Sequence, residues 1–162
     1  MDKHQIYAFL QGHGIWHEVT EHAAVYNMAE ASALELPYPE ADAKNLFVRD
    51  EKHENYYMLT VPGDKRVDLK AFRRAYGTRP LSFATSEELM GILGLIPGAV
   101  TPLGLLNDAG RRVRLFLDSA FFAPPGLVGV HPNDNTATVW LRAEDLLAIV
   151  RAHGNEAQAA EL

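Results

Sequence analysis

The chain has 162 residues, of which 48% are hydrophobic and 22% are charged, a balance typical of one globular domain with a sizeable core. It contains no cysteine, which excludes disulfides, thiolate nucleophiles and cysteine-based zinc sites. The net charge of -6 argues weakly against nucleic acid as a partner. No signal peptide or membrane-spanning stretch is recognised, so we expect a soluble cytoplasmic protein.

The first part of the chain predicts a helix, a strand and a second helix. Apolar spacing over 2–11 is helical, and the alternation of apolar and polar residues over 15–20 is typical of a half-buried strand. Asn27, with Glu30 three residues later, forms a pattern like a capping box before an apolar stripe over 29–36. A proline-containing loop then leads to the next strand.

Residues 44–50 are predicted to be the strand on which the rest of the chain is organised. Leu46 and Val48 would point to one side, and Phe47 and Arg49 to the other. Lys44 and Asn45 stand together at its start, where a cation beside an amide can hold an anionic or polar ligand. The simpler interpretation of this stretch alone is a solvated lysine before an ordinary strand.

The middle of the chain predicts a strand over 56–61, which would form a hairpin with 44–50, and a short strand over 81–84. It also predicts helices over 68–76 and 87–93. Thr85 and Glu88 form a capping box for the helix that ends at Gly94. The following stretch, 94–104, combines glycine and proline with apolar residues. It predicts a stiff, buried loop able to present backbone N–H groups to a ligand, or simply a tight core turn.

The last part predicts three strands and a closing helix, over 113–117, 127–130, 136–140 and 143–153. The closing helix lacks a good N-cap, and the tail from Gly154 is expected to fray. Helices and hairpins are mixed without a regular βαβ alternation. This order favours a single α+β domain, covering 1–162, on a mixed and largely antiparallel sheet.

Charge is unevenly distributed along the chain. The segment 44–79 carries nine Lys/Arg against five Asp/Glu, a net charge of +4 on an acidic protein. A local basic face can still contact phosphates, although a solvated helix face is an equally good explanation. The candidates for nucleic-acid contact are Lys65, Arg66, Lys70, Arg73 and Arg74.

Several common catalytic signatures are absent from the sequence. The seven histidines follow no metal-ligand spacing, and there is no Walker loop, dinucleotide glycine motif or GxSxG. A metalloenzyme or nucleotide-dependent enzyme is therefore not expected. His131 stands at the start of an Asn/Asp-rich turn between two predicted strands, where a hydrogen-bonded turn residue is the commoner role.

Three motifs in this order resemble a known family: KNLFVRD over 44–50, GAVTP over 98–102 and HPNDNTATV over 131–139. Together with LSFA over 81–84 and TPLGLLND over 101–108, they are similar to the YbaK/ProX aminoacyl-tRNA editing superfamily. This superfamily is related to the insertion domain of bacterial prolyl-tRNA synthetase. The resemblance covers nearly the whole chain and is closest to the ProXp-ala (PrdX-like) branch. Asn45 differs from the threonine of the cysteinyl-tRNA deacylase branch.

The resemblance implies a central mixed, barrel-like sheet and a pocket for the terminal adenosine and its aminoacyl ester, with no metal or other cofactor. Lys44 would hold the nucleotide end and orient the ester, with Asn45 beside it. The resemblance also implies catalytic roles for Asn45, Gly98 and His131. The loop residues expected to contact the aminoacyl group are Ala99, Val100, Thr101 and Pro102, and the candidate pocket-wall residues are Val25, Tyr26 and Met28.

The implied activity is trans-editing hydrolysis of mischarged tRNA(Pro), above all of alanyl-tRNA(Pro). The alternatives are removal of serine, threonine, cysteine or 2-aminobutyrate, and a non-catalytic nucleic-acid-binding module of the same fold. A mischarged acceptor end is the expected partner, delivered with the help of prolyl-tRNA synthetase or an elongation factor. We expect a monomer or weak dimer and no membrane association.

Overall fold

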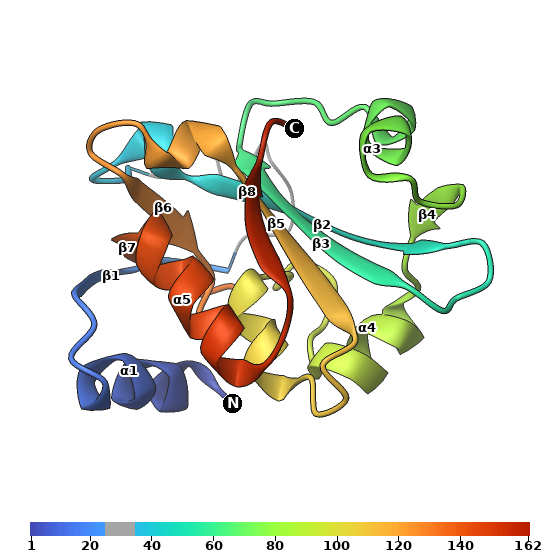
Figure 1. Ribbon diagram of the computed structural model, residues 1–162. Helices are drawn as coiled ribbons and strands as arrows, with labels where there is room; N and C mark the ends of the chain where they lie inside the picture. The colour runs from blue at the N-terminus through green and yellow to red at the C-terminus, as the bar shows by residue number, and fades with distance from the viewer. Residues whose placement is uncertain (25–34) are drawn as a thin grey trace.

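The computed structural model describes residues 1–24 and 35–162. The expected helix around Asn27 and the wall residues Val25, Tyr26 and Met28 lie outside the described residues. Within them, the strands form two open sheets, and helices cover the larger one (Figure 1). The α+β class is confirmed. The expected barrel-like closure is not found in the described parts of the chain, because the two strand orders do not join into one ring.

The larger sheet has the strand order β4–β2–β3–β5–β8. The pairs β4–β2 and β2–β3 are antiparallel, whereas β3–β5 and β5–β8 are parallel. This sheet is therefore mixed, as the sequence predicted. Its strands are β2 (Ala43–Asp50), β3 (Tyr56–Pro62), β4 (Leu81–Phe83), β5 (Val113–Asp118) and β8 (Ala157–Ala160).

The smaller sheet is antiparallel, with the order β1–β7–β6. Its strands are β1 (His17–Glu21), β6 (Leu127–Val130) and β7 (Ala137–Arg142). The helices are α1 (Lys3–Gly12), α3 (Leu69–Tyr76), α4 (Ser86–Leu93) and α5 (Ala143–His153), with 3-10 turns η1 (Pro39–Ala41), η2 (Pro102–Asn107) and η3 (Ser119–Phe122).

The alternation predicted for β2 is confirmed by the two clusters that it separates. Val48 packs with Phe72 of α3 on one face of the large sheet. Phe47 packs on the other face with Tyr56 and with the core beneath α4 and α5. Because the two faces are both covered, this strand is fixed in register, and the side chains at its start have defined directions.

The expectation about the end of the chain is wrong, and the irregular stretch expected over 94–104 ends a few residues earlier than predicted. The tail beyond Gly154 does not fray, because β8 pairs in parallel with β5. Asn155 anchors the turn before it by donating to Asp108 Oδ2 and to the Val113 carbonyl, both at 2.8 Å. The end of the expected irregular stretch is the start of η2, which Thr101 caps by accepting from the backbone N–H of Leu103.

The predicted capping box of α4 is confirmed, and its glutamate also fastens this helix to the β2–β3 hairpin. Glu88 Oε2 accepts from the Tyr56 hydroxyl at 2.6 Å and contacts His53 Nδ1 at 2.9 Å. Its Oε1 accepts from the Thr85 backbone N–H at 3.0 Å. Burial would raise the pKa of Glu88, but these hydrogen bonds to the carboxylate outweigh it and lower the pKa to about 2.

Glu88 is therefore expected to stabilise the fold less as the solution becomes acidic. Its folded-state pKa lies below its ordinary value of 4.5, so its contribution is complete above about pH 5 and is lost as the pH falls towards 2. Between these limits, the wild-type protein should lose about 3 kcal/mol more stability than Glu88→Gln. Urea unfolding at several pH values measures this difference, and parallel pH curves for the two proteins would contradict it.

Candidate functional site

Lys44 and Asn45 begin β2 and point to opposite faces of the large sheet, as neighbouring strand residues do. The Lys44 ammonium donates to the backbone carbonyl of Lys65, on the side of α3. Asn45 instead donates from Nδ2 to the Val100 carbonyl at 3.3 Å and accepts from the Thr60 hydroxyl at 2.7 Å. The two side chains therefore contact different segments, and Asn45 faces the loop that contains residues 98–102.

This loop is tied to the turn that contains His131. Thr101 is completely buried, and its hydroxyl donates to the His131 carbonyl at 2.6 Å. Gly98 has φ +91°, a backbone conformation that favours glycine, and Ala99 is buried beside it. The structure thus joins Asn45, the 98–102 loop and His131 into one hydrogen-bonded unit, although they are far apart in the sequence. Pro102 is buried at the start of η2.

His131 is held as a neutral ring with a defined tautomer. Its Nδ1 lies 3.1 Å from the Ala137 carbonyl, and a carbonyl only accepts, so Nδ1 carries the proton and Nε2 is the acceptor. Burial lowers the pKa of His131, and nearby His22 adds to this effect, against the opposing hydrogen bond to Ala137. The Nε2 atom of a neutral imidazole in this tautomer can accept a hydrogen bond from a water or a ribose hydroxyl.

His22, Asp42 and Thr138 were not predicted as site residues, but the fold brings His22 close to His131 and places the other two beside His22. The rings of His22 and His131 are 6.4 Å apart between centroids. His22 Nδ1 donates to the Ala23 carbonyl at 2.8 Å, and its Nε2 is 3.0 Å from the Thr138 hydroxyl. Burial raises the pKa of Asp42 to about 6, with His22 opposing the shift. No sequence spacing links these residues, since strand pairing alone brings them together.

A cavity of about 200 Å³ lies beside Asn45. The predicted residues Gly98 and Val100 line it together with Asn45, so part of the candidate site opens onto this space. Its other lining residues come from β2, from β4 and the residue after it, from α4 with its N-cap, and from the loop that follows α4: Leu46, Phe47, Phe83, Ala84, Thr85, Ser86, Leu89 and Pro97.

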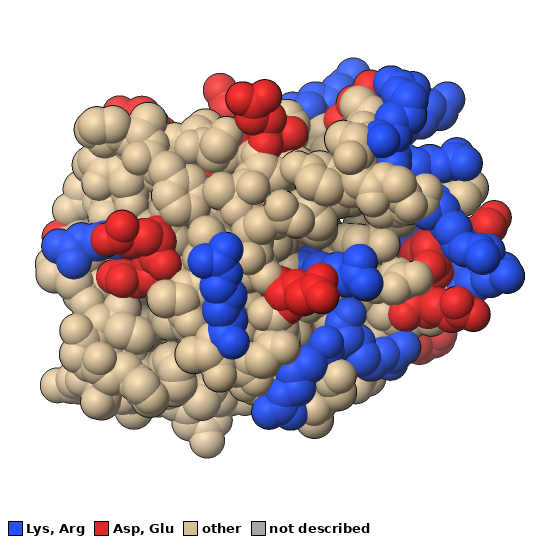
Figure 2. All heavy atoms as spheres, in the orientation of Figure 1, with Lys and Arg blue, Asp and Glu red and all other residues tan. Residues whose placement is uncertain are grey.

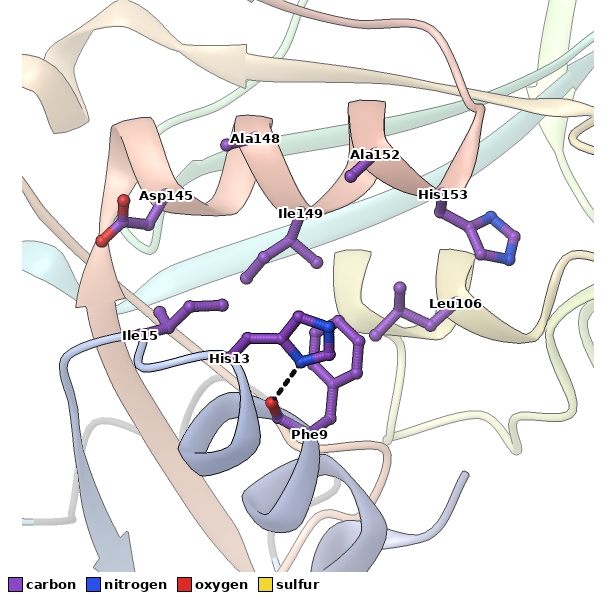
Figure 3. A pocket seen from close by; sticks show the side chains of 9 residues that line it. All are labelled: Phe9, His13, Ile15, Leu106, Asp145, Ala148, Ile149, Ala152 and His153. Atoms are coloured by element: carbon purple, nitrogen blue, oxygen red, sulfur yellow. Dashed lines mark hydrogen bonds between the residues drawn. The ribbon is translucent and has the colours of Figure 1, made fainter.

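A larger cavity of about 370 Å³ lies between α1, α5 and η2 (Figure 3). Ile149 and Ala152 of α5 face Phe9 and His13 across it, and His13 Nδ1 is bonded to the Phe9 carbonyl at 2.8 Å. None of the predicted site residues that fall within 1–24 and 35–162 lines this cavity. We therefore do not place the candidate site there.

The candidate nucleic-acid contacts lie in and before α3. Figure 2 shows Lys and Arg side chains gathered over this part of the molecule. Arg66, Lys70, Arg73 and Arg74 are exposed. Lys65 differs, because its ammonium forms an ion pair with the buried carboxylate of Asp118 at 2.6 Å. Its charge is therefore partly neutralised within the protein.

Within 1–24 and 35–162, no three His, Cys, Asp or Glu side chains are grouped so that they could bind a metal ion. In the same ranges, no helix is long and apolar enough to cross a bilayer.

Comparison with known proteins identifies the family. The aminoacyl-tRNA editing domain matches residues 22–149, which include all three motifs in full. The chain is 38% identical over 160 residues to the prolyl-tRNA editing protein ProX of Acetoanaerobium sticklandii, covering 99% of this chain and 97% of that one. It is 35% identical over 142 residues to the prolyl-tRNA synthetase associated domain-containing protein 1 of Mus musculus, covering 86% and 83%.

Solved structures give the same result. One crystal structure, provisionally described as a trans-editing enzyme for prolyl tRNA synthetase, aligns with a TM-score of 0.72 and 26% identity. The alignment covers 99% of this chain and 95% of that one. Together with the hydrogen-bonded unit of Asn45, the 98–102 loop and His131, these matches show that the chain belongs to the aminoacyl-tRNA editing domain family, whose chemistry is hydrolysis of an aminoacyl-tRNA ester.

Proposed function

We propose that this protein is a trans-editing deacylase that removes alanine from mischarged tRNA(Pro). The observation that carries the proposal is the near full-length similarity to a prolyl-tRNA editing protein, in a chain whose Asn45, 98–102 loop and His131 form one connected unit. Lys44 precedes Asn45 on the same strand and projects from its opposite face. The substrate is then the ester between an amino acid and the terminal ribose of the tRNA.

In this proposal, a water molecule attacks the ester carbonyl carbon, and the carbonyl oxygen takes up negative charge. Backbone N–H groups of the 98–102 loop would stabilise that oxyanion, and the Lys44 ammonium would join them by leaving the Lys65 carbonyl and turning towards the ester, so no covalent nucleophile is needed. The C–O bond to the ribose then breaks, and a proton passes to the ribose oxygen. His131 Nε2, or the 2′-hydroxyl of the substrate, would move this proton.

Discrimination against proline would be steric. A pocket that fits the alanine methyl group can reject the proline ring by a clash, whereas one methylene more or less changes binding by only about 1–3 kcal/mol. Amino acids close to alanine in size are the hardest to exclude in this way, so their release rates measure how closely the pocket fits the alanine methyl group. Val25, Tyr26 and Met28 remain the candidates for the wall that makes this distinction.

The experiment that tests the proposal compares alanyl-, prolyl- and cysteinyl-tRNA(Pro) as substrates, with a chelator present throughout. We expect rapid release of alanine, with proline and cysteine retained. A panel charged with serine, threonine and 2-aminobutyrate then defines the specificity. If tRNA(Pro) binds but no amino acid is released from any of these esters, the deacylase proposal is wrong and the binding-module alternative replaces it.

The exposed arginines of α3 are expected to contact the phosphates of the tRNA. Arg73 and Arg74 lie in the last turn of this helix, and neither forms an ion pair with a carboxylate among residues 1–24 and 35–162. Replacing both with glutamine should reduce the slope of log K against log salt by about 0.7–0.9 for each lost phosphate contact.

Fluorescence anisotropy of labelled tRNA(Pro) at several salt concentrations measures this slope. Arg114→Gln is the matched control, because Arg114 is also exposed but lies on β5 and pairs with Glu156 at 3.2 Å. An equal slope for the wild type and the Arg73/Arg74 double variant would remove α3 from the tRNA interface.

A further inference from the structure

Phe83 is the most exposed of the large hydrophobic side chains in the described residues, at 59%. It ends β4, a short strand whose first residue, Leu81, packs inward against the cluster beneath α3. A single exposed aromatic ring needs no special explanation. This ring, however, lines the same cavity as Asn45 and Gly98 of the candidate site.

The cavity exists because β4 covers only part of the edge of β2. Their pairing extends from Asp50 to Val48, and the Ala84 N–H makes one more bond, to the Phe47 carbonyl at 2.9 Å. The chain then turns away into α4, on the right-hand side of Figure 1. The cavity lies beyond this point, at the stretch of β2 that β4 leaves uncovered.

Size and charge restrict what this cavity can bind. Its volume of about 200 Å³ is below the roughly 300–1,000 Å³ of sites that enclose drug-sized ligands, so it suits a single planar ring system. Among the described residues, no Lys, Arg, Asp or Glu lines it, and the first turn of the adjoining α4 carries two acidic residues. A phosphate is therefore disfavoured, and a neutral heterocycle is favoured.

The lining combines an aromatic face with neutral hydrogen-bonding groups. Phe83 provides the face and Pro97 adds an apolar surface, while Ser86 and Asn45, which carry a hydroxyl and an amide, belong to the same lining. This combination is typical of nucleobase sites, in which a base stacks on an aromatic ring and its edge meets a few polar groups.

We propose that Phe83 is the stacking platform for the terminal adenine of the tRNA. This inference rests on the proposed function, because the ester of an aminoacyl-tRNA is carried by the ribose of that same nucleotide. An ester beside Asn45 and Gly98 places its adenine within reach of the cavity that these residues share with Phe83. The base thereby holds the ribose, and the ester with it, in the candidate site.

The test measures the affinity of uncharged tRNA(Pro), labelled at its 5′ end, by fluorescence anisotropy. One tRNA ends in adenosine and the other in an abasic nucleotide. Phe83→Ala should weaken binding of the first about 5- to 10-fold and leave binding of the second unchanged, because the base it would stack on is missing. Phe83→Trp, which restores an aromatic face, should bind like the wild type.

Met90→Ala is the matched control, since Met90 is also an exposed apolar residue, at 51%, but does not line the cavity. It should change neither affinity. If Phe83→Ala weakens binding of both tRNAs equally, or of neither, the proposal that Phe83 stacks on the adenine is wrong. Because uncharged tRNA is used, a failed deacylation assay would refute the proposed function without affecting this result. If the protein is an active deacylase but the effect of Phe83→Ala does not depend on the terminal base, the role of Phe83 alone is refuted.

Discussion

Replacing Lys44 with alanine is expected to lower the rate of alanine release by at least about 100-fold, the effect typical of losing one group that stabilises an oxyanion. The Lys44 ammonium bonds to a backbone carbonyl, and no carboxylate pairs with it among residues 1–24 and 35–162. Its positive charge is therefore not neutralised by a described side chain and remains available to a developing negative charge. Single-turnover deacylation with saturating enzyme measures the chemical step directly.

Binding measurements separate the two roles expected of Lys44. If it stabilises the oxyanion, Lys44→Ala should bind uncharged tRNA(Pro) nearly as well as the wild type. If it holds the nucleotide end, the affinity should fall together with the rate. Lys52→Ala is the control, because Lys52 lies exposed in the turn between β2 and β3 and should change neither quantity. Wild-type deacylation by Lys44→Ala would exclude Lys44 from the site.

The elements around β2 could be predicted because their signals are local. Alternation along 44–50 and the polar turn after it predicted the β2–β3 hairpin, and the structure pairs these strands from Ala43–Pro62 to Arg49–Tyr56. The Thr85–Glu88 pair predicted the start of α4 for the same reason, since a capping box lies within four residues. Such patterns need no information from distant parts of the chain.

The C-terminal strand could not be predicted because its stability comes from pairing with a distant segment. The sequence AQAA over 157–160 has neither β-branched residues nor apolar alternation. It forms β8 because β5 provides an edge and because Asn155 is fixed by Asp108. The barrel-like expectation was wrong for a related reason, since closure depends on how separate sheets join.

The candidate site shows the same division between local and distant signals. The resemblance indicated Lys44, Asn45, the 98–102 loop and His131 as separate motifs, and their roles remain predictions. The sequence carried no signal that Thr101 bonds to the His131 carbonyl, or that His22 lies near His131. These contacts depend on the register of β7 against its neighbours, which only the folded chain defines.

Gly129→Ala is expected to destabilise the protein by more than about 2 kcal/mol. Gly129 lies opposite Trp140 in the β6–β7 ladder, and the indole covers the place where a side chain would project. An added Cβ would come within 2.2 Å of Trp140 Cζ3, far inside van der Waals contact. Trp140 cannot move aside easily, because it is completely buried and its Nε1 donates to the Thr20 hydroxyl at 2.9 Å.

Gly91→Ala is the matched control, because it makes the same chemical change where the structure has room. Gly91 is exposed in α4, and an added Cβ would meet nothing within 4 Å. Alanine should stabilise this helix by about 0.5–1 kcal/mol, since glycine loses more backbone freedom on folding. Urea unfolding of both variants measures these opposite shifts. If Gly129→Ala is as stable as the wild type, β6 must be able to move away from Trp140. The small sheet, from which the turn containing His131 extends, would then be less rigid than its packing indicates.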